Sequence, residues 1–286
     1  MKKLLNIFLI TMCIFGIVGC ADSIVSSVSG SSFVESIVDS IKETISNSET
    51  SSNESSSNET STSNKENSST SINQIKWDEL NYIAFGDSIT FGADYSNSYQ
   101  QMTTPYPTAV GNMLGLKSVN NQAVSGATYS KHEELYCMSE RILRTTTEAD
   151  IISVMLGVND YTRSQPLGKM GDNDLTTIYG AINKTMEHLT TNYPNAYIFY
   201  MTPYKIASNS YYWQNKNEQG YYLIDVCNAI KETAELYNID VLDMFEYGNY
   251  EEEMHDADSD GIHPNQDFVL SYTAPQIVQF IKKNYK

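Results

Sequence analysis

The chain has 286 residues, of which 35 are acidic and 18 are basic, giving a net charge of −17 at pH 7. A surplus of negative charge repels the phosphates of nucleic acids, so the composition excludes nucleic-acid binding by bulk electrostatic attraction. This balance agrees with an exported protein that acts on a neutral substrate.

Residues 1–19 have the pattern of a secretory signal peptide, because Lys2 and Lys3 precede an apolar run that is too short for a comfortable membrane span. The run ends in the letters IVGC, which resemble the lipobox of bacterial lipoproteins, whose cysteine becomes lipid-modified. We therefore expect Cys20 to anchor an exported protein to the bacterial cell membrane, with its domain on the extracellular side. The alternative is a plain signal peptide in which the cysteine is incidental.

Residues 20–74 are predicted to form a lipid-anchored linker rich in serine, asparagine and threonine. Apolar residues between positions 34 and 45 have helical spacing, which predicts a short amphipathic helix; scattered side chains in a disordered tether explain them equally well. Residues 46–73 contain no aromatic residue and no periodicity, so they cannot bury a core and are expected to be disordered.

Residues 75–286 are long enough for one domain with a full core. Short apolar runs alternate with longer helical patterns, which predicts parallel βαβ units in a three-layer α/β/α fold with a central five-stranded parallel sheet. The predicted strands are 82–85, 118–121, 151–156, 196–201 and 240–243, and the predicted helices are 106–114, 132–144, 175–191, 222–237 and 268–284.

Four short motifs follow one another along this domain. GDS places Ser88 after the first predicted strand, at the sheet edge where α/β proteins bind ligands. A serine becomes a nucleophile only when a base takes its proton and fixed donors stabilise the oxyanion. SGA offers the amide of Gly126, GVND offers the side chain of Asn159, and DSDGIH places Asp260 three positions before His263, where a carboxylate can orient the imidazole.

This ordered set resembles the SGNH hydrolase family, also called GDSL-type esterases and acylhydrolases, over about residues 78–284. The resemblance implies a flavodoxin-like fold and a reaction that needs no metal or organic cofactor. It also implies that Ser88 is the nucleophile, that His263 is the general base and then acid, and that Asp260 orients His263. The implied oxyanion hole consists of the amides of Ser88 and Gly126 and the side chain of Asn159.

The segment around the histidine has a second interpretation, because residues 256–267 match the pattern of an EF-hand calcium loop. The preceding residues make a poor entering helix, and His263 occupies a place where EF-hands usually have an aliphatic side chain, so we favour the triad. The two hypotheses differ in whether Asp260 faces His263 or a metal. The EF-hand positions are Asp256, Asp258, Asp260, Gly261 and Asp267.

A longer insertion at residues 203–222 follows a predicted strand and should lie at the catalytic edge. Its aromatic density suits stacking on sugar rings, which favours a carbohydrate ester with a short acyl group such as acetyl; packing against the domain's own flank explains it nearly as well. The alternatives are a lysophospholipase or broad-specificity esterase, and a non-catalytic surface lipoprotein that binds glycans or calcium. The predicted substrate-binding residues are Tyr204, Tyr211, Tyr212 and Trp213.

Two cysteines, Cys137 and Cys227, lie within the predicted domain. An exported protein can pair them, but both fall in predicted helices, where a buried free thiol is the commoner outcome. We therefore expect two free, buried cysteines.

Overall fold

The computed structural model describes residues 75–208, 210–246 and 260–286. The expected signal peptide, Cys20 and the linker up to residue 74 lie outside these ranges, as do Asp256 and Asp258 of the calcium-loop pattern. Within these ranges, no helix is both long and apolar enough to cross a membrane.

Five parallel strands form the central sheet: β1 (Asn81–Gly86), β4 (Ser118–Asn121), β5 (Ile151–Met155), β6 (Tyr197–Met201) and β7 (Asp240–Leu242). Their order is β4-β1-β5-β6-β7, so the chain adds β4 on one side of β1 and the later strands on the other. Doubly wound sheets bind ligands beyond the carboxyl ends of the strands at such a reversal. The predicted fold class is confirmed, and every predicted strand is present.

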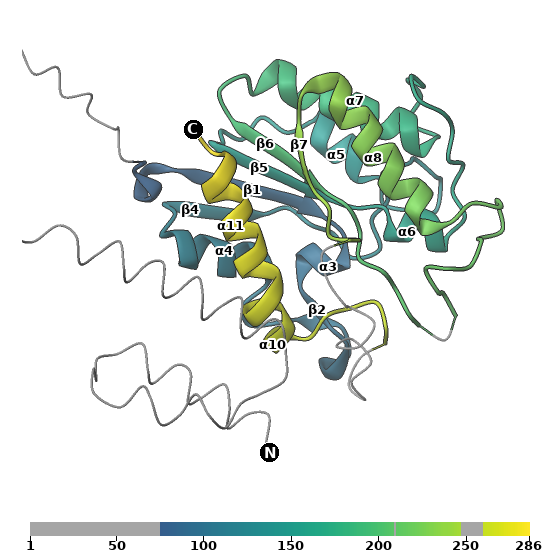
Figure 1. Cartoon of the computed structure of the whole chain (residues 1–286), viewed down its shortest axis with the longest axis horizontal. Helices are drawn as coiled ribbons and strands as arrows, with labels where there is room; N and C mark the ends of the chain where they lie inside the picture. The colour runs from purple at the N-terminus through teal and green to yellow at the C-terminus, as the bar shows by residue number, and fades with distance from the viewer. Residues whose placement is uncertain (1–74, 209, 247–259) are drawn as a thin grey trace, which may run out of the picture. The chain divides into compact units, whose positions relative to one another are not determined.

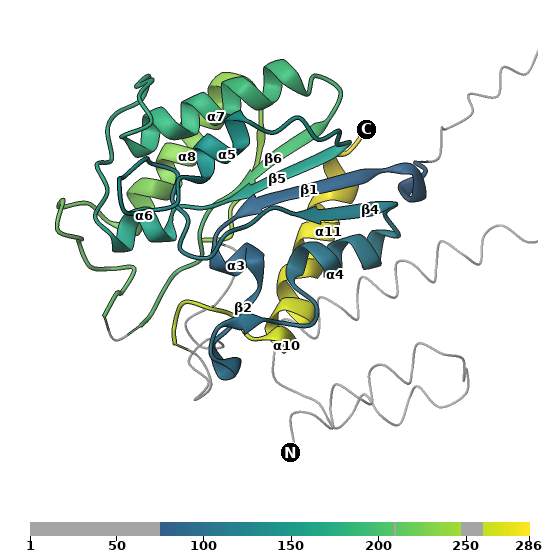
Figure 2. The ribbon, with the colours of Figure 1, turned by 180° about the vertical axis from the view of Figure 1, so that it is seen from behind.

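Two groups of helices cover the two faces of the sheet (Figures 1 and 2). One group consists of α4 (Tyr106–Leu114) and α11 (Ala274–Asn284), and the other of α5 (Met138–Leu143), α7 (Ile178–Asn192) and α8 (Leu223–Tyr237). Two short helices, α3 (Ser88–Phe91) and α6 (Val158–Thr162), follow β1 and β5 at the carboxyl edge. The remaining elements are η3 (Trp77–Glu79), β2 (Ala93–Asp94), η4 (Tyr95–Asn97), β3 (Gln100–Gln101), α10 (Gln266–Phe268) and η5 (Val269–Thr273).

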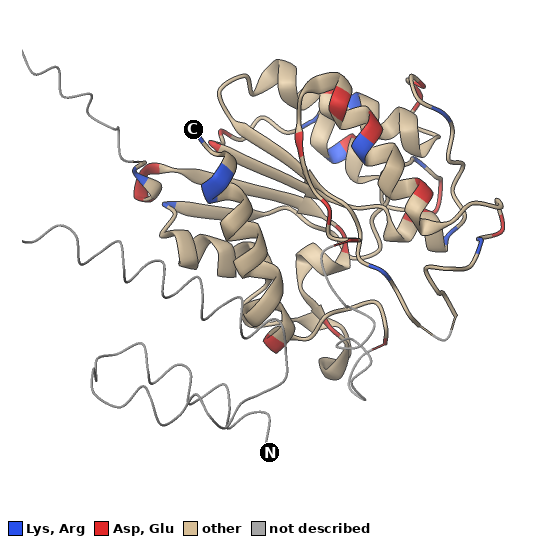
Figure 3. Cartoon of the chain, in the orientation of Figure 1, with Lys and Arg blue, Asp and Glu red and all other residues tan. Residues whose placement is uncertain are grey.

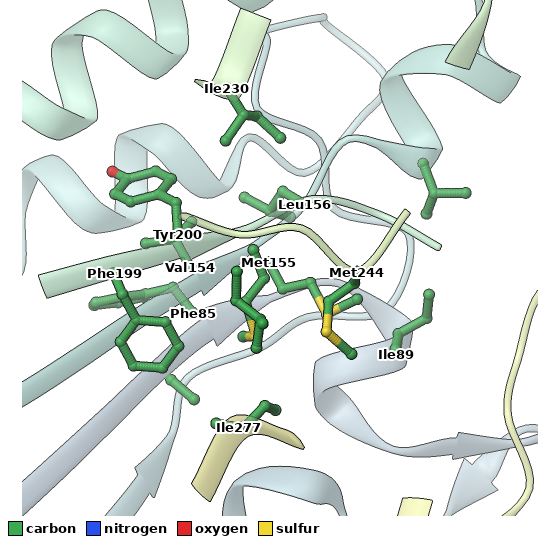
Figure 4. Packing of buried hydrophobic residues seen from close by; sticks show 14 of the residues in the cluster. Phe85, Ile89, Val154, Met155, Leu156, Phe199, Tyr200, Ile230, Met244 and Ile277 are labelled. Carbon is green, nitrogen blue, oxygen red and sulfur yellow. The ribbon is translucent and has the colours of Figure 1, made fainter. Parts of the chain in front are cut away.

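The core lies on both faces of the sheet, which explains why the central strands are almost continuously apolar. Every residue of β5 is buried. Figure 4 shows side chains of β1, β5 and β6 packed between Ile230 of α8 and Ile277 of α11. This packing holds the strand ends, and the motifs that follow them, in fixed positions.

One predicted helix is only half present. The sequence predicts a helix over residues 132–144, but α5 begins at Met138, so the prediction is wrong for residues 132–137. The Thr128 amide donates to Tyr136 O at 3.0 Å, and the Met138 amide donates to Thr128 O at 2.9 Å. The backbone at residues 136–138 therefore pairs with Thr128 instead of forming helical hydrogen bonds.

The predicted last helix, residues 268–284, contains a π-helical turn, η5, before α11. Pro275 lies in the first turn of α11 and has no N–H to donate to the carbonyl group four residues earlier. The missing hydrogen bond accounts for the wider turn at this point.

Both cysteines of the domain are free and buried, as the sequence predicts. Cys227 lies within α8, whereas Cys137 is the N-cap residue of α5 rather than part of a helix.

Candidate active site

Ser88 is the first residue of α3, directly after β1, and the residue is only 8% exposed. The turn requires glycine at position 86, because a Cβ atom there would collide with the side chain of Thr90. Asp87 caps the helix by accepting a hydrogen bond of 3.0 Å from the Ile89 amide. The GDS motif thereby holds the serine hydroxyl at the carboxyl edge of the sheet.

The structure brings the three residues expected to form a triad into one continuous chain of contacts. Ser88 Oγ lies 2.8 Å from His263 Nε2, and His263 Nδ1 lies 2.7 Å from Asp260 Oδ2. Ser88 and His263 are 175 residues apart in the sequence, and they meet at the end of β1. In this arrangement the imidazole can accept the serine proton while the carboxylate stabilises the imidazolium.

Asp260 is held by its own turn as well as by the imidazole. Its Oδ1 accepts hydrogen bonds from the amides of Ile262 at 2.9 Å and His263 at 2.8 Å. Burial acts to raise the pKa of Asp260, but the hydrogen bonds from His263 and Ile262 outweigh it and lower the pKa to about 2. Asp260 is therefore ionised at neutral pH, and its contribution to stability is lost as the pH falls from about 4 through about 2.

Gly126 and Asn159 lie on two segments that adjoin the end of β1. The Val124 amide donates to Gly86 O at 3.1 Å, which places the segment before Gly126 beside β1. Asn159, in α6, donates from Nδ2 to Ala127 O at 3.0 Å. Gly126 has a φ of +78°, a left-handed conformation that glycine adopts without steric cost.

Three polar groups are available to a developing negative charge. The amide of Ser88, in the first turn of its helix, and the amide of Gly126 have no acceptor among the residues that the structure describes. The Asn159 amide group retains a second hydrogen after its bond to Ala127 O. An oxyanion requires donors of this kind, and the role of these three groups in an oxyanion hole stays a prediction.

Asp160 supports this arrangement, although no sequence pattern distinguishes it from an ordinary turn aspartate. It is fully buried, and its carboxylate accepts hydrogen bonds from the Tyr129 amide (2.8 Å), the Ser130 amide (2.9 Å) and the Ser130 hydroxyl (2.7 Å). Burial raises the pKa of Asp160, and these hydrogen bonds oppose that rise. Together with Asn159, it ties α6 to the segment that follows Gly126.

The four aromatic residues predicted to bind substrate have different environments. Tyr204 is fully buried and its hydroxyl lies 3.0 Å from a threonine hydroxyl of η5, so its assignment to substrate binding is wrong and it belongs to the core. Trp213 is partly buried and packs edge-on against Phe245 with ring centres 5.5 Å apart. Tyr211 is 41% exposed, and with Tyr212 it lines a cavity of about 340 Å³.

This cavity lies between the insertion and α6. Its lining includes Tyr161 and Arg163, which follow Asn159 in the chain. The Tyr161 hydroxyl lies 3.0 Å from Tyr212 O and 2.7 Å from Asn215 O, so it anchors the insertion to α6. The insertion therefore reaches the carboxyl edge of the sheet.

The calcium-loop interpretation depends on where Asp260 points. Its two oxygens face the His263 ring and the backbone of its own turn, as the triad hypothesis predicts. Asp267 lies in α10 and is exposed. Within the described ranges, no three histidine, cysteine, aspartate or glutamate side chains gather as metal ligands.

Ser88 contacts His263, which in turn contacts Asp260, and three amide donors are present in the same part of the fold. This is the arrangement of a serine hydrolase. Here it stands at the carboxyl edge of a doubly wound parallel sheet, in the chain order Ser, Gly, Asn, His. The chain belongs to the GDSL-like lipase/acylhydrolase family, whose model matches residues 84–268. It is thus a serine esterase of the SGNH type.

Solved structures share this fold. A protein from Lactobacillus plantarum is 26% identical, with a TM-score of 0.63 over 73% of this chain and 99% of its own. A carbohydrate acetylesterase family member from Sinorhizobium meliloti is 17% identical (TM-score 0.51, covering 71% of this chain and 98% of its own), and the M. smegmatis aryl esterase is 15% identical (TM-score 0.51, covering 71% and 99%). No curated protein matches the sequence.

Proposed function

We propose that the protein is a cell-surface serine esterase that removes short acyl groups, such as acetyl, from carbohydrate esters. The observation that carries the catalytic part is the unbroken contact chain from Ser88 Oγ through the His263 ring to Asp260. A binding-only module has no physical need for this geometry beside three amide donors.

The mechanism is a two-step acyl transfer. His263 takes the Ser88 proton as Ser88 Oγ attacks the ester carbonyl carbon, and the oxyanion faces the amides of Ser88 and Gly126 and the side chain of Asn159. The imidazolium, stabilised by Asp260, then protonates the departing alcohol and leaves an acyl-enzyme. Water attacks this intermediate with His263 as base, which releases the acid and restores the serine.

The carbohydrate part of the proposal is supported by the cavity at the insertion. Tyr211 and Tyr212 contribute aromatic surface there, and Asn215 contributes a side-chain amide that can bond sugar hydroxyls. The Sinorhizobium structure is described as a carbohydrate acetylesterase family member, so the fold accommodates such a substrate class. The preference for carbohydrate rests on this cavity.

The cellular location is part of the same proposal. The signal-like pattern of residues 1–19 and the letters IVGC favour export and lipid attachment at Cys20. Residues 20–74 would then act as a tether that lets the esterase domain reach substrates outside the cell.

Nitrophenyl esters of increasing acyl length, together with an acetylated polysaccharide, test the proposal. We expect release of acetate from both acetyl substrates and little turnover of long-chain esters. Ser88→Ala should lower kcat by at least ~10⁴-fold without changing Tm, because it removes the nucleophile and little buried volume. The matched control Ser271→Ala, at an exposed serine of η5, should leave kcat unchanged.

Two other results of these hydrolysis assays would contradict the proposed function. Efficient cleavage of long-chain esters would replace the carbohydrate proposal with a lysophospholipase or broad-specificity esterase. If neither the protein nor the Ser88 variant hydrolyses any ester and calcium raises Tm, a non-catalytic calcium-binding role takes its place.

A further inference from the structure

Tyr99 contacts both partners of the histidine–aspartate pair. Its hydroxyl donates a hydrogen bond of 3.3 Å to Asp260 Oδ2, the same oxygen that faces His263 Nδ1. Its ring stands edge-on to the imidazole, with ring centres 5.3 Å apart and planes at 75°. Tyr99 and Asp260 are 161 residues apart in the sequence, so only the tertiary fold brings them together.

The backbone at Tyr99 is held in a strained conformation. Ser98 and Tyr99 have φ values of +54° and +61°, a left-handed conformation that is unfavourable for residues other than glycine. The turn between β2 and β3 holds them there, because the Tyr99 amide donates to Asp94 O at 2.8 Å. Strain of this kind persists where the surrounding structure compensates for it, and it is frequent at functional sites.

The contacts have a direct chemical consequence. A neutral donor on Oδ2 disperses the negative charge of Asp260 and holds the carboxylate in the plane in which it meets Nδ1. Partial desolvation and the Asp260 charge raise the pKa of Tyr99, so its hydroxyl stays protonated and continues to donate. Asp87, the residue before Ser88, is the other carboxyl group that interacts electrostatically with His263.

We propose that Tyr99 is a positioning residue of the esterase, which orients the Asp260–His263 pair through its hydroxyl and packs its ring edge-on against the imidazole. The proposal rests on the proposed function and adds to it a residue that lies outside the GDS, SGA, GVND and DSDGIH motifs. Tyr99 acts through Asp260 and His263 and does not touch the reacting atoms.

Tyr99→Phe and Tyr99→Leu separate the two contacts, with Tyr95→Phe and Tyr95→Leu as matched controls. Tyr95 is a neighbouring tyrosine that is 41% exposed and packs edge-on against Tyr99, but within the described residues no contact joins it to His263 or Asp260. We expect Tyr99→Phe to lower kcat on nitrophenyl acetate about 3–10-fold and Tyr99→Leu to lower it further, with KM within about twofold. Tyr95→Phe should match the unchanged protein, and Tyr95→Leu, which removes a ring that packs against Tyr99, should lower kcat less than Tyr99→Leu does.

The pH dependence of kcat/KM distinguishes the two roles of Tyr99, because the loss of a merely structural contact would leave the pH profile unchanged. Without the hydroxyl, the Asp260 charge is directed more strongly at the imidazolium, so the acid limb of the profile should move to higher pH in Tyr99→Phe. The far-downfield proton NMR signal of the His263 Nδ1–H should move as well. In an Asp260→Asn background, Tyr99→Phe should have almost no further effect, because the two residues act together.

The proposal is overturned if Tyr99→Phe has the kcat and pH profile of the unchanged protein, or if its effect appears in KM alone. Equal losses in the Tyr95 and Tyr99 variants would also overturn it, since they would indicate a general effect on the hairpin. An unchanged protein without esterase activity would instead contradict the proposed function, so the two failures are distinguishable.

Discussion

Two aspartates lie next to the Ser88–His263 pair, and their surroundings shift their pKa values in opposite directions. Asp260 is only partly buried and accepts several hydrogen bonds, so its pKa falls to about 2. Asp87 is 2% exposed, and burial raises its pKa to about 7 because its hydrogen bond from Ile89 and the charge of His263 offset only part of the desolvation. Two residues of one type thus occupy different protonation states near pH 6.

Asp87→Asn should change the pH dependence of stability. Between pH about 4, where an unfolded aspartate ionises, and about 7, folded Asp87 keeps a proton that the unfolded chain has lost, so stability falls as the pH rises. Asparagine preserves the helix cap and does not titrate. We expect the variant to gain stability relative to the unchanged protein between pH 4.5 and 8, on the order of a few kcal/mol, as measured by urea unfolding.

Asp94→Asn is the matched control, because Asp94 caps η4 through a similar hydrogen bond to Ser96 but is not fully buried. This variant shows what the loss of a carboxylate cap by itself does to stability, without the full burial of Asp87. Parallel stability curves for Asp87→Asn and the unchanged protein would show that burial does not raise the pKa of Asp87.

At the scale of elements, the loop that carries Asp260 and His263 is fastened to the insertion by backbone contact. The Ala207 amide donates to Gly261 O at 2.8 Å. Gly261 has a φ of +74°, and a Cβ atom there would lie 2.6 Å from the carbonyl carbon of Ala207 and from the amide nitrogen of Ser208. The insertion therefore positions the histidine loop as well as lining a cavity, so the two elements act as one unit.

Gly261→Ala should therefore reduce activity through geometry. The added methyl group must push residues 260–263 away from residues 207–208, and a displacement of about 1 Å at a catalytic group costs on the order of 10²-fold in rate. We expect kcat on nitrophenyl acetate to fall at least about tenfold.

Gly220→Ala separates this steric effect from backbone strain. Gly220 has a φ of +84° and nothing within 4 Å of the added atom, so the variant should lose about 1 kcal/mol of stability and keep its kcat. Equal kcat values for the two variants would contradict the steric argument.

At the scale of the whole molecule, the described residues all fall within one compact unit, Ser71–Lys286. Figure 3 shows acidic and basic residues interspersed along the described elements. The family model lies entirely within this unit. The esterase chemistry is thus contained in the part of the chain after the proposed tether.

Cys20→Ala tests the proposed anchor. In cell fractionation we expect the unchanged chain in the membrane fraction and the variant released from it, because a lipidated cysteine is the proposed attachment. The kcat on nitrophenyl acetate should be the same for both, since every proposed catalytic residue follows residue 74. Equal membrane association of the two chains would contradict attachment at Cys20.

The sequence by itself determined the fold class and the central strands, because buried parallel strands are short apolar runs, as in β1, β5 and β6. It also placed Ser88, Gly126, Asn159 and His263 near one edge, since residues that follow parallel strands meet at the carboxyl ends of the sheet. The Asp260–His263 relation is local, so its spacing alone predicts the contact.

Only the tertiary structure decided what depends on contacts between distant segments. Tyr204 is a core residue, because it is fully buried and its hydroxyl lies beside a threonine hydroxyl of η5, 69 residues later in the chain. Asp160 holds residues 129–130, and Tyr99 reaches Asp260 from a strained hairpin. Each of these positions follows from the packing of elements far apart in the chain, which local patterns of hydrophobicity and spacing do not contain.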